Sequence, residues 1–374
     1  MSWLIFILAF FITIMVVVGI HESSHFLAAK LMGVKVLRFS IGFGKSLISF
    51  HDKSGTEYVF ALIPLGGYVK MLGETDDASK EEQKQSYASQ PFYKKACIIL
   101  AGPLSNFVCA WILYSLVYSI GFSALKPILG PITPTSIAAK AGLTSHDEII
   151  QVDDTETLSW TKVVFQFVLH AGDTKPLLVR TKKICGLDHT AMNCQSTTAT
   201  HQMDLSTWSL NGLKPDPLGS LGIAPYLPPN ITIRDVMLQK IQYSPIDAMY
   251  HAYLQCKELT YFNLIVIKKM LFGQLSLDGL GGPIAIFDTA GQALNQGMVV
   301  FLVFLAFMNL SIGLINLFPI PGLDGGQLLL QMIEWILRKP ISPIAVEIIV
   351  RIGFAVLLLL FFRVLYNDIL RLMQ

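Results

Sequence analysis

Long uninterrupted apolar runs dominate the hydrophobic pattern of this chain. Three of them, Trp3–Ile20, Ala96–Phe122 and Met298–Leu323, hold no charged residue. A fourth run, Ile348–Leu365, holds arginines only near its ends, where a long side chain can reach the headgroups. About 20 apolar residues in a helix cross the hydrocarbon core of a bilayer. The pattern predicts a polytopic α-helical membrane protein with about four transmembrane helices.

Two intervening segments have a different pattern. The stretch from residue 123 to residue 297 is rich in Ser, Thr, Pro and Asp, and predicts a soluble domain followed by an amphipathic region. That region either lies in the membrane interface or packs on the soluble domain as an ordinary helix. Between the first two apolar runs, Phe39–Phe50 and Glu57–Met71 have β-type composition with Gly and Pro breaks. They form either a hairpin that folds back into the protein, away from lipid, or a cytoplasmic subdomain.

Composition and charge agree with a membrane protein. Of the 374 residues, 53% are apolar and only 14% are charged, whereas a soluble domain carries about 25% charged residues. The net charge is +2 without a long basic or acidic run, so we expect membrane lipid around the chain and no nucleic-acid partner. Ten lysines and arginines lie between the first two apolar runs, and the positive-inside rule therefore places this loop in the cytoplasm.

The first apolar run leads directly into a metal-binding motif. His21-Glu22-Ser23-Ser24-His25 has the HExxH pattern, in which two histidines four residues apart share one face of a helix. Both can bind one Zn²⁺, while Glu22 on the adjoining flank can accept a proton from an activated water. Ionisable residues at the end of a membrane span are costly and are functional by default. A cluster that merely ends the helix is the alternative.

A catalytic zinc site needs a third protein ligand. Asp324 follows 26 uncharged residues, comes after the helix-breaking Pro319 and Pro321, and precedes two glycines. Broken backbone at membrane depth is tolerated only inside protein or beside water, so an acid at this point is a candidate ligand. Asp-Gly-Gly as a plain turn is the alternative, and Glu334 and Asp278 are rival ligands.

These motifs together resemble the site-2 protease family, most closely the Gram-negative regulator-of-sigma-E proteases. His-Glu-Ser-Ser-His at residue 21 and Asn-Leu-Phe-Pro-Ile-Pro-Gly-Leu-Asp-Gly-Gly ending at residue 326 carry the resemblance. Other matching segments start at Phe39, Ile63, Ala101 and Leu280, so the resemblance extends along the whole chain. Gln327 and Ser311 depart from the family pattern, which commonly has His and Asn there.

The resemblance implies an intramembrane zinc metalloprotease of the cell inner membrane. Its substrates would be single-pass transmembrane proteins that another protease has already trimmed, including an anti-sigma factor of the envelope stress response and signal-peptide remnants. It implies Zn²⁺ as cofactor and Glu22 as catalytic base. The implied metal ligands are His21, His25 and Asp324. The implied substrate-binding residues are Asn316, Pro319, Pro321, Tyr58, Val59, Leu62, Gly66 and Gly67, the last five in a re-entrant β-element that pairs with an unwound substrate strand.

The resemblance also divides the chain into four regions. Residues 1–122 hold two transmembrane helices and the β-element, and residues 123–230 form one PDZ domain (α+β), where relatives commonly carry two. Residues 231–297 are an interfacial amphipathic region, and residues 298–374 hold the last two transmembrane helices and the third ligand. The PDZ domain is expected in the periplasm and the active site toward the cytoplasm.

Cys185 and Cys194 lie in the domain of residues 123–230, which is expected in the periplasm. This oxidising compartment and the spacing of the two cysteines predict a disulfide between them. A catalytically inert membrane scaffold or receptor that uses its PDZ domain to bind partners is the alternative function. Asp324 argues against it, because an inert protein has no need for an acid at this position.

Overall fold

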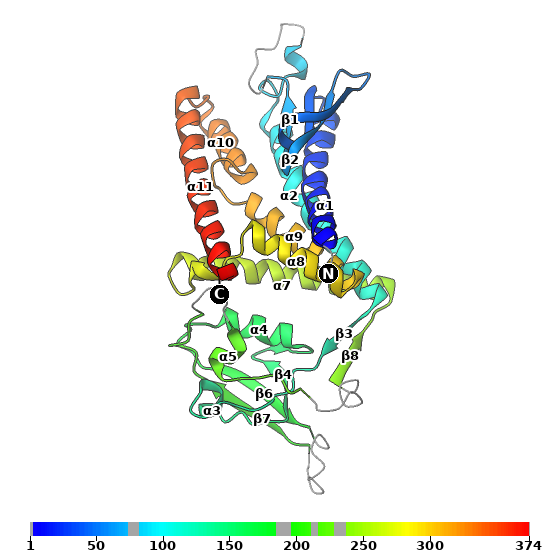
Figure 1. Cartoon of the computed structure of the whole chain (residues 1–374). Coiled ribbons are helices and arrows are strands. Elements are labelled where there is room, and N and C mark those ends of the chain that lie inside the picture. Colours follow the sequence, from blue (N-terminus) through cyan, green and yellow to red (C-terminus); the bar gives the residue numbers. More distant parts are fainter. Residues whose placement is uncertain (1–2, 74–81, 185–195, 211–215, 228–236, 374) are drawn as a thin grey trace. The chain divides into compact units, whose positions relative to one another are not determined.

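The computed structural model describes residues 3–73, 82–184, 196–210, 216–227 and 237–373, and Figure 1 shows the course of the chain. The chain forms two compact units. The first comprises Met1–Val117, Pro245–Thr260 and Gly281–Asp368; the second comprises Tyr118–Ser244, Tyr261–Leu280 and Ile369–Gln374. Cys185 and Cys194 lie outside the described residues, so their disulfide stays a prediction.

Four helices of the first unit are long and apolar enough to cross a membrane, as the apolar runs predicted. They are α1 (Trp3–Leu31), α2 (Phe92–Ile120), α9 (Met298–Asn316) and α11 (Pro343–Met373). The C-terminal ends of α2 and α11 continue into residues of the second unit. On α1 the buried side chains recur every four residues, so one stripe of this helix faces protein. That stripe is formed by Ala9, Thr13, Val17, His21, His25 and Ala29.

The predicted β-type segments form a sheet beside the C-terminal half of α1 (Figure 1). Strands β1 (Val36–His51) and β2 (Glu57–Met71) are long and bent, and each pairs with the other twice. The register gives four segments in the order 46–51, 57–61, 36–41 and 67–71. The two outer pairings are antiparallel, whereas the partners in the central pairing, 38–41 with 57–60, run in the same direction. Segments 46–51 and 67–71 are therefore the two edges of this sheet.

The turn between β1 and β2 is built by Asp52. Its carboxylate accepts hydrogen bonds from the backbone N–H groups of Ser54 and Thr56, and Gly55 adopts a φ of 84°. The Ser54 hydroxyl, the Thr56 amide and the Lys30 ammonium stabilise the charged carboxylate and hold the pKa of Asp52 well below its usual range. This turn fixes where β1 ends and β2 begins.

Shorter elements complete the first unit. Helix α8 (Pro283–Gln296) packs against α1, and the missing side chain of Gly291 makes room for the Phe6 ring. The buried Asp368 carboxylate of α11 accepts hydrogen bonds from three backbone N–H groups at the start of α8, where the helix dipole favours negative charge. The other elements are η1 (Gln83–Gln85), α10 (Asp324–Leu337) and the first part of α7 (Pro245–Leu271).

The second unit is an α+β domain around one apolar core. Its sheet has the order β5-β4-β6-β7, with all neighbours antiparallel, and β3 pairs with β8 separately. The elements are β3 (Phe122–Leu125), α3 (Ile137–Lys140), β4 (Asp147–Val152), β5 (Thr155–Glu156), α4 (Trp160–Leu169), β6 (Leu177–Lys183), β7 (Thr198–Met203), α5 (Pro217–Leu221), β8 (Leu238–Ile241) and η2 (Leu277–Gly279).

The last part of α7 packs on this domain. Phe262, Val266 and Met270 contact its core, and Phe262 stacks on Phe165 with ring centroids 4.4 Å apart. Lys269 is 5% exposed and donates to the Ala171 carbonyl and to Asp173, 2.9 Å away. For this part of the amphipathic region, the packed-helix interpretation describes the structure.

Candidate metal centre and active site

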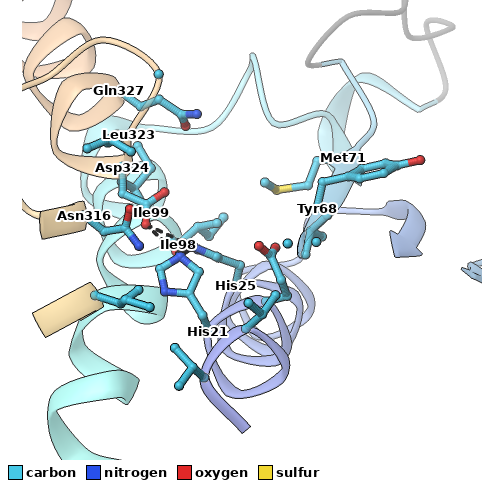
Figure 2. A pocket seen from close by; sticks show the side chains of 18 of the residues that line it. His21, His25, Tyr68, Met71, Ile98, Ile99, Asn316, Leu323, Asp324 and Gln327 are labelled. Carbon is cyan, nitrogen blue, oxygen red and sulfur yellow. Dashed lines mark hydrogen bonds and ion pairs between the residues drawn. The ribbon is translucent and has the colours of Figure 1, made fainter. Parts of the chain in front are cut away.

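The HExxH motif lies on the buried stripe of α1. His21 and His25 are 8% and 9% exposed and are separated by one helical turn, so their imidazoles share a face. Because nothing in the apolar run breaks the helix before Leu31, the motif stays helical and its two side chains keep this spacing. Figure 2 shows both rings pointing toward Asp324.

Asp324 is held by the packing of its two glycine neighbours. Helix α9 ends at Asn316, and Asp324 is the first residue of α10. A Cβ at Gly325 would lie 2.3 Å from the Leu317 carbonyl oxygen, and one at Gly326 would lie 2.2 Å from the Ile320 carbonyl oxygen. Both glycines are therefore needed for α10 to approach the preceding loop this closely. The Asp-Gly-Gly sequence is more than a plain turn, because it fixes the position of the carboxylate.

Three ligand atoms converge at this point. His21 Nε2 lies 3.2 Å from His25 Nε2 and 3.0 Å from Asp324 Oδ2, and His25 Nε2 lies 3.4 Å from Asp324 Oδ2. Zinc ligands about 2.0–2.1 Å from a tetrahedral ion are about 3.3 Å from each other. Asp324 Oδ2 is buried and, among the described residues, receives no well-directed hydrogen bond although both imidazole nitrogens are near. The donor set and its spacing therefore fit Zn²⁺.

Nδ1 of His25, the ring nitrogen that faces away from the ligand cluster, makes a hydrogen bond to the backbone. His25 Nδ1 lies 2.8 Å from the backbone carbonyl oxygen of Ile98 on α2. A carbonyl can only accept, so Nδ1 carries the proton and donates it. Nε2 of His25 therefore keeps its lone pair for a metal, which is the usual arrangement around metal-binding histidines.

The three residues line a cavity of about 560 Å³. Glu22 lines the same cavity, and the backbone of β2 lies against its side chain: a Cβ at Gly67 would lie 2.7 Å from Glu22 Cγ. In Figure 2, Asn316 and Gln327 lie on the Asp324 side, and Tyr68 and Met71 lie across from them. A base, a set of metal ligands and a strand edge thus line the same cavity.

The chain matches peptidase family M50 over residues 9–360. It belongs to that family. Protease RseP of Yersinia pestis is 32% identical over 460 aligned positions, and the regulator of sigma-E protease RseP of Escherichia coli K12 is 32% identical over 459 positions; both alignments cover 100% of each chain. The regulator of sigma E protease of Haemophilus influenzae is 30% identical over 453 positions, again with full coverage.

The M50 assignment agrees with the four apolar helices and with the His-His-Asp cluster. Together they support a metalloprotease embedded in a membrane. The alignments are longer than the 374 residues of this M50 chain, so the two relatives contain segments that this chain lacks.

The cavity brings together only some of the residues that the sequence suggested for this M50 chain. It is lined by His21, Glu22, His25, Asp324, Asn316, Gly66 and Gly67, but not by Pro319, Pro321, Tyr58, Val59 or Leu62. Val59 is buried in the inner segment 57–61, where it pairs with Ser40 on one side and Ser49 on the other.

Three contributors to the site had no assigned role at the level of sequence. Phe43 and Tyr68 line the cavity and stack with ring centroids 6.3 Å apart, and Ile98 acts through its backbone carbonyl. Aromatic residues in a β-type segment are too common to single out. A backbone acceptor leaves no mark on the identity of its residue, so sequence reasoning has no signal for Ile98.

Proposed function

We propose that this M50 chain is an intramembrane zinc protease of the site-2 type. Its substrates would be transmembrane segments of membrane proteins that have already been trimmed. The observation that carries the proposal is the convergence of His21, His25 and Asp324 beside Glu22, on a helix long and apolar enough to cross a membrane. No observation of the structure favours the alternative of an inert scaffold.

The chemistry assigned to the site is hydrolysis of a peptide bond. Zn²⁺ held by His21, His25 and Asp324 would supply a Lewis acid that polarises the scissile carbonyl and acidifies a water molecule. Glu22 accepts a proton from the water that attacks the carbonyl carbon. Glu22 then returns this proton to the amide nitrogen as the C–N bond breaks, and is regenerated as a carboxylate.

Substrate binding is assigned to the edge segment of β2. Gly67, Tyr68 and Val69 pair with β1 on one side, and no other strand in the described part of the chain pairs with them on the second side. An unpaired edge of this kind can take up an extended peptide as a further strand. A helical substrate must unwind to bind there, and unwinding exposes the peptide bond to attack.

Of the predicted substrate residues other than Gly66 and Gly67, Asn316 lines the cavity, and the rest lie outside it. Asn316 lies across the cavity from this edge (Figure 2), and its amide is suited to hold the substrate backbone from that side. Pro319 and Pro321 shape the loop before Asp324, and the inner segment with Tyr58 and Val59 supports the edge. We therefore centre the substrate site on Gly66 to Val69, with Gly66 and Gly67 shared with the sequence prediction.

The cellular setting is part of the same proposal. The relatives are named as regulators of sigma E, which supports an anti-sigma factor, besides signal-peptide remnants, as a single-pass substrate in the inner membrane. The ten basic residues of the first loop support an active site toward the cytoplasm. Residues 123–230 are proposed to be a single periplasmic PDZ domain, and the longer relatives leave room for a second.

The exposed face of α7 is assigned to the membrane interface within region 231–297. Ile246, Tyr250, Tyr253 and Tyr261 recur on this face at helical spacing and are exposed. Tyrosine is favoured at headgroup level because its ring is apolar and its hydroxyl is polar. Lipid is therefore the expected partner of this face.

The proposal is tested with purified full-length protein and a model transmembrane substrate in detergent. Glu22→Gln should retain zinc, because the ligands are intact, and should lose cleavage by roughly 100- to 10,000-fold, the usual contribution of a general base. Glu347→Gln, an exposed glutamate of α11, is the matched control and should cleave normally. Full activity of Glu22→Gln would refute the mechanism.

A further inference from the structure

One face of α2 runs beside the two histidines. Ile98, Gly102 and Asn106 follow each other at intervals of four residues and therefore share this face. A Cβ at Gly102 would lie 2.2 Å from His25 Nε2 and 2.8 Å from His21 Cε1. The α2 backbone thus approaches the ligand atoms directly, and only glycine fits at this position. The neighbours of Gly102 on the same face are consequently placed to contact the outer nitrogens of both histidines.

Asn106 contacts His21 in this way. It is 0% exposed, and its Nδ2 lies 3.3 Å from His21 Nδ1. Its Oδ1 is buried without a hydrogen-bond partner among the described residues. A buried amide oxygen without a partner destabilises the fold, so the position of this side chain needs a reason. Its place next to the ring nitrogen of His21 suggests the reason.

The tautomer of His21 decides how Asn106 is used. When His21 carries its proton on Nε2, it can donate to Asp324 Oδ2, and Nδ1 accepts from the Asn106 amide nitrogen. When Nε2 gives its lone pair to a metal, the proton must lie on Nδ1, and Nδ1 then needs an acceptor. Rotation of the Asn106 carboxamide by 180° exchanges Nδ2 for Oδ1 and supplies this acceptor.

We propose that Asn106 is a positioning residue of the metal centre. Its Oδ1 accepts the Nδ1 proton of His21 in the metal-bound state, as the Ile98 carbonyl does for His25. The inference rests on the proposed function only in requiring zinc at this site. Removal of a hydrogen-bond partner of a metal ligand commonly weakens metal binding by roughly 10- to 100-fold.

The test is the zinc affinity of the purified full chain, measured by competition with a chelator. Asn106→Leu keeps the volume but loses the acceptor, and should bind zinc roughly 10- to 100-fold more weakly than wild type. Asn106→Asp keeps an acceptor at the same place and should therefore bind zinc more tightly than Asn106→Leu. Asn309→Leu is the matched control, because Asn309 is also 0% exposed but, within the described part of the chain, donates its hydrogen bond to the Leu305 carbonyl of its own helix and not to a histidine.

Two results would overturn the inference. One is a zinc affinity of Asn106→Leu equal to that of Asn309→Leu, whether both match wild type or both fall. The other is an equal loss of affinity in Asn106→Asp and Asn106→Leu. If Asn106→Leu is too unstable for titration, the thermal midpoint with and without chelator replaces it. The difference between the two midpoints should be smaller in Asn106→Leu than in Asn309→Leu, and equal differences would refute the role. Wild-type protein that binds no zinc would refute the proposed function instead.

Discussion

The substitution Gly67→Ala tests whether the sheet positions the Glu22 carboxylate. The added Cβ would lie 2.7 Å from Glu22 Cγ and 2.7 Å from the Ser40 carbonyl oxygen. Carbon atoms in contact are about 3.5–4.0 Å apart, so Glu22 and the new methyl group must separate by about 1 Å. The Ser40 carbonyl belongs to the backbone of the paired strand, so the strand shifts as well and does not relieve the contact at Glu22 without moving the sheet. The backbone at Gly67 does not have a positive φ, and alanine therefore causes no conformational strain of its own.

A displacement of this size is large for a catalytic base. Misplacement by about 1 Å can cost roughly 100-fold in rate, which corresponds to about 2.7 kcal/mol in activation free energy. The added methyl group approaches none of the three proposed zinc ligands among its nearest atoms. We therefore expect a loss of about 100-fold in kcat without a loss of zinc.

The assay compares kcat and zinc content of Gly67→Ala with those of Gly19→Ala. Gly19 is also a glycine near the motif, but a Cβ there meets nothing within 4 Å, so this control should cleave like wild type. If Gly67→Ala cleaves as fast as Gly19→Ala, the sheet does not position Glu22. If it loses zinc together with activity, the effect does not act through the base.

Two further predictions concern substrate binding and topology. Successive N–H groups of a strand point to opposite neighbours, so one of the two residues Tyr68 and Val69 directs its N–H to the substrate side. Proline at that residue removes the donor, so one of the variants Tyr68→Pro and Val69→Pro should lose cleavage while its zinc content is unchanged. Normal cleavage by both variants would exclude this edge. Reporter fusions at Gln83 and Asp188 should report the cytoplasm and the periplasm respectively, as the basic first loop predicts. The same compartment for both would contradict the four-span topology.

The spans and the candidate ligands were predictable because they depend on local patterns. An uncharged run long enough to cross a bilayer is visible in the sequence, and the spacing of His21 and His25 requires only that the run continue as a helix. Asp324 could be predicted because few acidic residues follow such apolar runs directly. The need for glycine at 325 and 326 could not be predicted, since it depends on carbonyl groups of a loop that folds back on α10.

The edge of the β1–β2 sheet could not be predicted from the pattern of residues. Both halves of β2 have strand-like composition, and only the pairing register places Val59 inside the sheet and Gly67 to Val69 at its edge. Long-range pairing of this kind leaves no periodic signal. Asn106 is a similar case, because its relation to His21 depends on how α1 and α2 pack, 85 residues apart in sequence.

The zinc X-ray absorption spectrum of the purified full-length protein tests the central claim most directly. We predict one zinc bound by two imidazole nitrogens and by oxygen at about 2.0–2.2 Å, without sulfur. The His21→Ala and Asp324→Ala variants should lose this zinc. A zinc–sulfur distance of about 2.3 Å, or a spectrum that is unchanged in Asp324→Ala, would contradict the account.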